Sequence, residues 1–299
     1  TLESMDANEY NPNGVLARLD SIFEKMSNRD MLTDKIHELS ANIYAGLQEY
    51  EKSCNCYEQV LKSRKSEFTI KSFERYCNTL TKLTVQQYGL RKINTKEAEK
   101  ILDKVIGDLV GLGKHFGEST ERWSLIGSAY KRKMHILRDA PVKQLMDTMM
   151  ESINAYKQAS KFSGFKDAYP LTNWLILTRL NLLLQEKTGL KDIDLEGRRA
   201  LQKIYEELKG NDLKSDDFWK MAHFVNIMLT QFLMGISDAK KEDIVNEYLK
   251  LWQLAGNKGQ KIAELEHFEI ISSVLDKVKS EDKMKTDFKE IVKKLQEAL

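Results

Sequence analysis

Proline, cysteine and glycine are all scarce in this chain of 299 residues, which contains 3 prolines, 3 cysteines and 15 glycines. So few prolines and glycines argue against a protein built from many turns, and no stretch alternates apolar and polar residues as β-strands do. The cysteines, Cys54, Cys56 and Cys77, are sparse and odd in number, which argues against a disulfide framework. We therefore expect a protein of a reducing compartment, the cytoplasm.

Long hydrophobic runs and an excess of one charge are also missing. No apolar run approaches the roughly 20 residues of a membrane-spanning helix, and the first residues do not form a signal peptide. The 47 Lys and Arg residues nearly balance the 45 Asp and Glu residues, and the two signs are interspersed. A net charge of +2 gives no broad attraction to nucleic acid or to an anionic membrane, so we expect neither as a partner.

The sequence does contain amphipathic helix along almost its whole length. Leu, Glu, Lys, Gln and Ala dominate long stretches in which apolar residues recur every three or four positions. In chain order these stretches predict an all-α superhelix, with one opening helix followed by six helical pairs. Since no linker rich in Pro, Gly or Ser separates them, we expect one solenoid domain over 1–299, with a lead-in at 1–13 and a C-terminal capping pair at 257–299.

The clearest repeat unit covers residues 121–159. Its first helix carries Trp123, Ile126, Gly127 and Tyr130, a spacing close to the W-x2-L-G-x2-Y opening of a tetratricopeptide repeat (TPR). The partner helix carries a small residue, an aromatic residue and an alanine at matching spacing: Ser152, Tyr156 and Ala159. We expect large side chains of one helix to fill gaps on the other, with glycine or alanine where the backbones approach.

Further copies of this unit follow and precede it. Trp174 and Trp219 repeat the position of Trp123, and Trp252 lies on the partner helix of the last of these copies. The three repeated tryptophans are 51 and 45 residues apart, whereas a standard repeat has about 34 residues. This difference predicts longer helices or loops and an irregular superhelix.

An earlier copy, near residues 31–63, is more divergent. His37 stands where tryptophan is expected, while Ala41, Ser53 and Tyr57 keep the register of the repeat. This copy is therefore interpreted as a degenerate repeat.

Two segments narrow the resemblance to one branch of the TPR proteins. GSAYKR at 127–132 and DAYPLTNWL at 167–175 resemble the TPR-type region called the TRAF-binding domain of MAP kinase kinase kinases. They are also similar to bacterial relatives of that region that are joined to CHAT (caspase-like) or TIR effector domains. The resemblance covers roughly residues 121–184 and implies a non-catalytic regulatory and binding region, so it supplies no catalytic residue.

Candidate catalytic and metal-binding motifs are incomplete. His37-Glu38 begins like a zinc-protease helix, but residue 41 is alanine where the second histidine should stand. Cys54 and Cys56 would point to different sides of a helix. The segment 111–115, GLGKH, lacks the leading glycine and the Ser or Thr of a phosphate-binding loop. We therefore predict no enzyme, no metal and no cofactor.

One compact basic run indicates a binding surface. Lys131 and Arg132 fall at repeat positions that line the concave groove of a TPR, and Arg179 and Lys220 fall at groove positions of the next two copies. Four cations along one groove would suit an acidic peptide or a terminal carboxylate. The alternative is that these charges form solvated helix surfaces.

The sequence thus predicts a scaffold that binds a protein or peptide on its concave face, without naming the partner or the oligomeric state. A second hypothesis makes the chain the sensor or regulatory region of a larger bacterial effector of the CHAT or TIR type, with its catalytic domain outside these residues. A third hypothesis is an RNA or ribonucleoprotein sensor. It is weaker than the other two because basic and aromatic residues are not interleaved, as they are in many RNA-binding surfaces.

Overall fold

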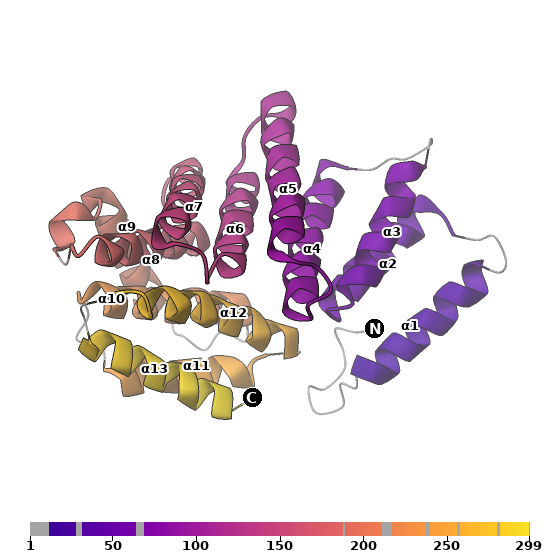
Figure 1. The fold of residues 1–299 in the computed structure, drawn as a ribbon. Helices are drawn as coiled ribbons and strands as arrows, with labels where there is room; N and C mark the ends of the chain where they lie inside the picture. Colours follow the sequence, from indigo (N-terminus) through magenta and orange to yellow (C-terminus); the bar gives the residue numbers. More distant parts are fainter. Residues whose placement is uncertain are drawn as a thin grey trace. The chain divides into compact units, whose positions relative to one another are not determined.

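The structure, a computed structural model, describes residues 12–27, 32–63, 69–187, 189–210, 217–236, 240–255, 258–279 and 282–298. Over these residues the chain forms thirteen α-helices and one short 3-10 helix, and none of them lies in a β-strand (Figure 1). The predicted all-α class, an opening helix with six pairs, is confirmed.

The chain divides into two compact units, 1–105 and 106–299. The first contains α1 (Pro12–Ser27), α2 (Asp34–Gly46), α3 (Tyr50–Lys62), α4 (Ile70–Gly89) and the start of α5 (Thr95–Phe116). In it α3 packs against both α2 and α4. Residues 1–11 of the predicted lead-in lie outside the described residues, and positions 12 and 13 already belong to α1.

The second unit contains the rest of α5 and all later helices. These are α6 (Thr120–Ile136), α7 (Val142–Phe162), α8 (Ala168–Leu184), α9 (Leu195–Gly210), α10 (Phe218–Met234), α11 (Lys241–Gln253), α12 (Lys258–Leu275) and α13 (Asp282–Glu297), with the 3-10 helix η2 (Leu190–Asp192) before α9. Neighbours in sequence pack on each other from α6 to α9, and so do α10 with α11 and α12 with α13. This consecutive packing is that of a helical solenoid.

Polar side chains fix where the helices begin. Ser119 accepts a hydrogen bond from the backbone N–H of Arg122 at 3.1 Å, and Asp217 accepts one from the backbone N–H of Trp219 at 2.9 Å. Such N-caps satisfy donors that the first turn leaves without a helical partner. At the other end of α10, Gly235 takes the left-handed conformation with φ 66°, which ends the helix.

The contact between α6 and α7 has the geometry that the repeat pattern predicts. A Cβ atom added to Gly127 would lie 2.9 Å from the ring of Tyr156, so only glycine fits there without movement. Ser152 Oγ donates to the carbonyl oxygen of Gly127 at 2.8 Å. The extra residues of this copy form helical turns, because α7 has 21 residues and starts well before Ser152.

The α2–α3 pair repeats this arrangement in the first unit. Ser53 Oγ donates to the carbonyl oxygen of Ala41 at 2.8 Å, and Tyr57 is fully buried. Ala41 and Tyr57 belong to one apolar cluster, against which Phe23 of α1 packs. The divergent copy near His37 therefore keeps the packing of the repeat although it lacks the tryptophan.

The tryptophans that mark the later copies lie in different environments. Trp174 is buried, and a Cβ atom added to Gly197 of α9 would lie 2.8 Å from its ring. Trp252 is also buried, but Trp123 is only half-buried. Trp219 is 53% exposed, whereas the preceding residue, Phe218, is buried. The inward position at the start of α10 is thus filled by Phe218.

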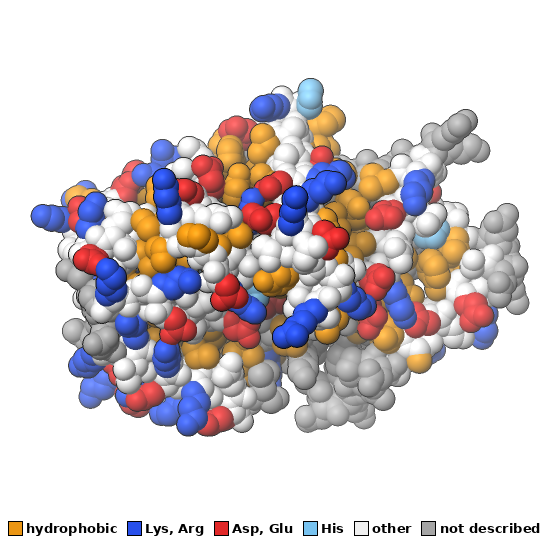
Figure 2. Space-filling view, in the orientation of Figure 1, with side chains coloured by type: hydrophobic (Ala, Val, Ile, Leu, Met, Phe, Trp, Pro, Cys, Tyr) orange, Lys and Arg blue, Asp and Glu red, His pale blue; other side chains and the backbone are white. Residues whose placement is uncertain are grey.

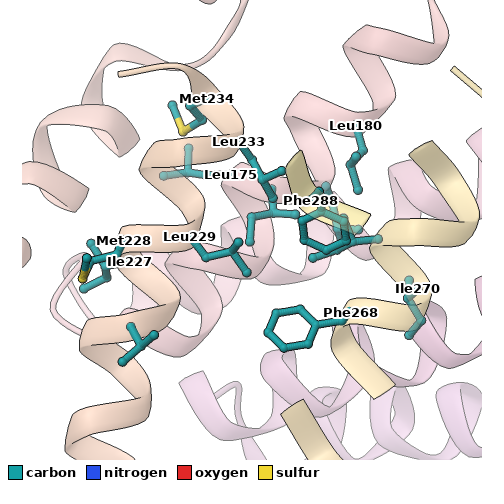
Figure 3. Close-up of a cluster of buried hydrophobic side chains, with 14 of the residues drawn as sticks. Leu175, Leu180, Ile227, Met228, Leu229, Leu233, Met234, Phe268, Ile270 and Phe288 are labelled. Atoms are coloured by element: carbon teal, nitrogen blue, oxygen red, sulfur yellow. The ribbon is translucent and has the colours of Figure 1, made fainter. Parts of the chain in front are cut away.

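The largest apolar core lies in the second unit. Figure 3 shows part of it, where side chains from four helices converge: Leu175 and Leu180 of α8, Leu229 and Leu233 of α10, Phe268 and Ile270 of α12, and Phe288 of α13. Helix α8 carries apolar residues on nearly every side. It can bury them because α7, α9 and α10 all pack against it.

Helix α12 departs from simple consecutive packing. Besides α13, it contacts α6 and α8, which lie more than 70 residues earlier in the chain, and α13 contacts α11 (Figure 1). The pair predicted as a C-terminal cap therefore reaches back to the first helices of two earlier repeats.

Candidate functional site

Lys131, the first of the predicted groove residues, lies where α12 meets α6 and α8. Its side chain is 8% exposed. The ammonium Nζ donates to Oδ1 of Asn173 at 2.7 Å and lies 3.3 Å from Nδ1 of His267. The helices α6, α8 and α12 are thus joined by one buried cation.

The neighbouring hydrogen bonds fix the roles of these atoms. The amide nitrogen of Asn173 donates to the backbone oxygen of Tyr169 at 2.9 Å, which leaves Oδ1 to face Lys131. While Lys131 is protonated its ammonium can only donate, and Nδ1 of His267 is then the unprotonated, accepting nitrogen. His267 is therefore neutral when this contact is made.

A second set of buried polar groups joins α10, α11 and α12. Tyr248 of α11 donates its hydroxyl to Oδ1 of Asn226 at 2.7 Å, and Nδ2 of Asn226 donates to Glu264 at 3.1 Å. Glu264 is 7% exposed. We call the six residues together the Lys131 cluster: Lys131, Asn173, Asn226, Tyr248, Glu264 and His267.

Burial controls the ionisation of this cluster. The pKa of Lys131 is lowered from 10.5 to about 7, chiefly by burial and also by the charge of Arg132, while Glu264 and Glu266 oppose the shift. Burial raises the pKa of Glu264, against the hydrogen bond from Asn226 and the charge of Lys131. These shifts follow from the free energy needed to remove a charge from water.

Two more basic residues follow Lys131 in the chain. His135 follows Lys131 by four positions and so lies on the same side of α6, and Arg138 lies in the turn that follows the helix. Burial and Arg138 lower the pKa of His135, while Glu266 of α12 raises it. Glu269, one helical turn further along α12, is influenced by Arg138. A basic side of α6 thus faces acidic residues of α12.

The other predicted groove residues differ from one another in exposure and in hydrogen-bond partners. Arg132 is half-buried and donates to Ser128 of its own helix. Arg179 is 6% exposed and donates through Nε to the backbone oxygen of Leu233 at 3.3 Å. Lys220 is exposed on the first turn of α10. Lys131 and Arg179 are therefore engaged within the chain, and partner binding by all four residues stays a prediction.

Two of the four cations remain accessible beside exposed aromatic rings. Tyr156 is influenced by the charge of Arg132 and lies with its hydroxyl 3.3 Å from that of Tyr169, which is 40% exposed. Trp219, 53% exposed, precedes Lys220 at the start of α10. We call Arg132, Tyr169, Trp219 and Lys220 the accessible face.

The starts of α8 and α10 lie close to each other. Burial lowers the pKa of His223 on α10, and the charge of Asp167, the N-cap of α8, opposes this shift. His223 follows Trp219 by four positions and so lies on the same side of α10. On the side of the molecule in Figure 2 acidic and basic side chains are interspersed, as the sequence predicts, so no single strong field dominates that view.

The sequence did not reveal the partners of Lys131. Asn226, Glu264 and His267 are polar residues on helices whose other inward positions are apolar. This interruption of the apolar pattern is the feature of the sequence that could indicate buried polar contacts. Glu264, His267 and Ile271 follow a spacing of three and four, so they share one side of α12. A charged residue within such an apolar stripe indicates a buried polar contact.

The catalytic and metal motifs weighed from the sequence fall on ordinary helical positions. Cys54 and Cys56 are buried, and burial raises their pKa values to about 12 and about 11, which disfavours the reactive thiolate. Residues 111–115 lie within α5. Among the described residues no group of three His, Cys, Asp or Glu side chains is placed to hold a metal ion.

Comparisons with known proteins agree with the helical-repeat geometry. None of the helices formed by the described residues has the length and apolar character that crossing a bilayer requires. No curated protein matches the sequence. Residues 49–178, which run from the start of α3 into α8, match the family described as Tetratricopeptide Repeats-Sensor (TPR-S). The helical pairs within these residues are therefore similar to tetratricopeptide repeats.

Proposed function

We propose that this chain is a non-catalytic sensor region that binds an acidic segment of a partner protein on the accessible face. The observation that carries the proposal is the combination of exposed rings at the starts of α8 and α10, those of Tyr169 and Trp219, with the exposed Lys220 and the half-buried Arg132 of α6. Aromatic residues and arginine dominate the binding energy of many protein interfaces. The TPR-S match supports a binding role, because its description names a sensor.

The chemistry of α6 supports an acidic partner. Its basic side already faces Glu264 and Glu266 of the chain's own helix α12. The next cation along α6, Arg132, lies toward Tyr156 and Tyr169 instead. A partner carboxylate would meet Arg132 or Lys220 through charge-assisted hydrogen bonds, while an apolar side chain packs on Trp219.

The test begins with affinity purification on the intact chain, identification of the captured protein, and titration of that purified protein. Trp219→Ala should weaken binding by about tenfold or more, because truncating an interface anchor costs about 2 kcal/mol or more. Arg132→Glu and Lys220→Glu should weaken binding most at low salt, since salt screens exposed charges.

Lys203→Glu is the matched control, because Lys203 is an exposed lysine on α9, outside the accessible face. It should leave the affinity unchanged. If Trp219→Ala and the two charge reversals bind as tightly as the control, the accessible face is not the binding surface.

The word "sensor" in the matched family favours a second candidate. In that candidate the chain regulates an effector domain of the CHAT or TIR type encoded beside it. The reading frame that contains these residues tests it, because an adjoining catalytic domain is expected. A complete frame without such a domain would contradict it.

A further inference from the structure

The contact between Lys131 and His267 constrains where protons can be. Nζ of Lys131 is 3.3 Å from Nδ1 of His267, and the hydrogen bond to Asn173 directs the same ammonium into this site. If His267 takes up a proton, both groups become donors and both carry positive charge at this distance. The contact then changes from attraction to repulsion, in surroundings that screen charges poorly.

We propose that the Lys131 cluster is a proton-dependent latch that keeps α12 docked on α6 and α8 only while His267 is neutral. This inference does not depend on the proposed partner, because it concerns contacts within the chain. Its consequence is that mild acid loosens the seam between α12 and the first helices of two earlier repeats.

The two sides of α12 differ in how they are held. On one side the ring of Phe268 lies 5.0 Å from that of Tyr248 and 6.0 Å from that of Phe288, in an apolar contact that protons do not affect. On the side of α6 and α8 the buried groups include Lys131 and His267, which titrate. Proton uptake therefore acts on the seam and leaves the contact with α11 and α13 in place.

The pH dependence of opening of the seam depends on all the charged groups that surround it. Helix α6 contributes Lys131, Arg132 and His135, and the turn after it contributes Arg138. Helix α12 contributes Glu264, Glu266, His267 and Glu269, while α8, α10 and α11 add the neutral Asn173, Asn226 and Tyr248. Burial lowers the pKa values of Lys131, His135 and His267, so opening the seam takes up protons at these residues. Burial raises the pKa values of Glu264 and Glu269, so opening releases protons there.

The effect has the same sign in two pH windows, because opening takes up a proton in each. Between the docked pKa of Lys131, about 7, and its ordinary value of 10.5, opening takes up one proton. Lowering the pH within this window should therefore favour opening by up to about tenfold per pH unit. Below 6.5, the ordinary pKa of a histidine, His267 takes up a proton on opening because burial and Lys131 hold its docked pKa well below that value. Glu264 partly offsets this second step.

Hydrogen exchange of the intact chain, followed from about pH 8.5 to about pH 5.5 and corrected for intrinsic rates, tests the latch. An undocked helix loses the packing that stabilises it, so its amides exchange faster. Exchange of α12 should rise on acidification relative to α7, which serves as the internal reference. Lys131→Met should remove the step above pH 7. His267→Gln, which keeps an acceptor for Lys131, should reduce the step below 6.5 to the part that His135 contributes.

Lys220→Met is the matched control, since it removes an exposed lysine of the same unit away from the seam. It should show both steps. The proposal is overturned if α12 and α7 follow the same pH dependence, or if both steps persist undiminished in Lys131→Met and His267→Gln. Should Lys131→Met fail to fold, the reduction or full persistence of the acid step in His267→Gln decides the question.

Discussion

Helix α6 is held on two sides by different physical means. Toward α7 the contact is one of shape, in which the ring of Tyr156 lies on Gly127 and Ser152 bonds to the glycine carbonyl. Toward α12 the contact contains the buried cation Lys131 and its polar partners. An apolar contact of the same size would be at least as stable, because removing charges from water is costly. The first side determines the fold, and the second makes the fold responsive to charge.

The strongest way to sharpen this contrast is to reverse the charge of Lys131. Lys131→Glu would place a second carboxylate near Glu264 and leave both buried without a cation, so we expect a loss of about 3–5 kcal/mol in the free energy of unfolding. Lys131→Met introduces no second carboxylate and should cost less, about 1–3 kcal/mol, because Asn173 and His267 lose their hydrogen-bond donor. Urea unfolding at neutral pH measures both variants. Equal losses for the two would mean that the seam depends on the length of the side chain and not on its charge.

On the α7 side the decisive change is one methyl group. Gly127→Ala brings a Cβ atom to 2.9 Å from the buried ring of Tyr156, so overpacking should destabilise the chain by about 1–3 kcal/mol. Gly107→Ala is the control, because no atom lies within 4 Å of a Cβ there, and it should stabilise α5 by about 0.5–1 kcal/mol. Thermal unfolding of the two variants gives the comparison. Similar shifts in both would contradict the close approach of α6 and α7.

A smaller effect is expected from the serine that bonds across the helix pair. Ser152→Ala removes the hydrogen bond to Gly127 and should cost about 1 kcal/mol. Ser53→Ala removes the equivalent bond to Ala41 in the first unit and should cost a similar amount. Urea unfolding followed by circular dichroism can measure both, and a loss in only one would show that the two pairs are not equivalent.

The smallest effect should come from a charge outside both contacts. Lys220→Glu changes an exposed residue on the first turn of α10, so the midpoint of thermal unfolding should not move. A clear shift would show that Lys220 takes part in a structural contact, and it would then be unsuitable as a probe of partner binding.

The helical fold and the α6–α7 contact could be predicted because they depend on local spacing. Gly127 and Tyr156 belong to neighbouring helices, and the repeat pattern places them together. The surroundings of Trp219 were harder to predict, because Phe218 and Trp219 are both large and apolar, and a shift of one residue decides which is buried.

The contact between Lys131 and His267 could not be predicted from spacing at all. The two residues are 136 positions apart, and the contact requires α12 to turn back onto α6. Sequence reasoning placed Lys131 on the concave face as an accessible cation. The structure shows it buried against the same chain, so a charge reversal there is now expected to affect stability as well as binding.

The serine and tyrosine shared by α3 and α7 have a consequence for recognising related proteins. In both helices serine precedes tyrosine by four positions, and in both the serine bonds to a small residue of the preceding helix. The preceding helix has tryptophan in one case and His37 in the other. A search that requires the tryptophan would therefore overlook the degenerate repeat, whereas one keyed to a small residue followed on the next helix by Ser-x3-Tyr would detect both. Distant members of such a lineage would be recognised by their second helices.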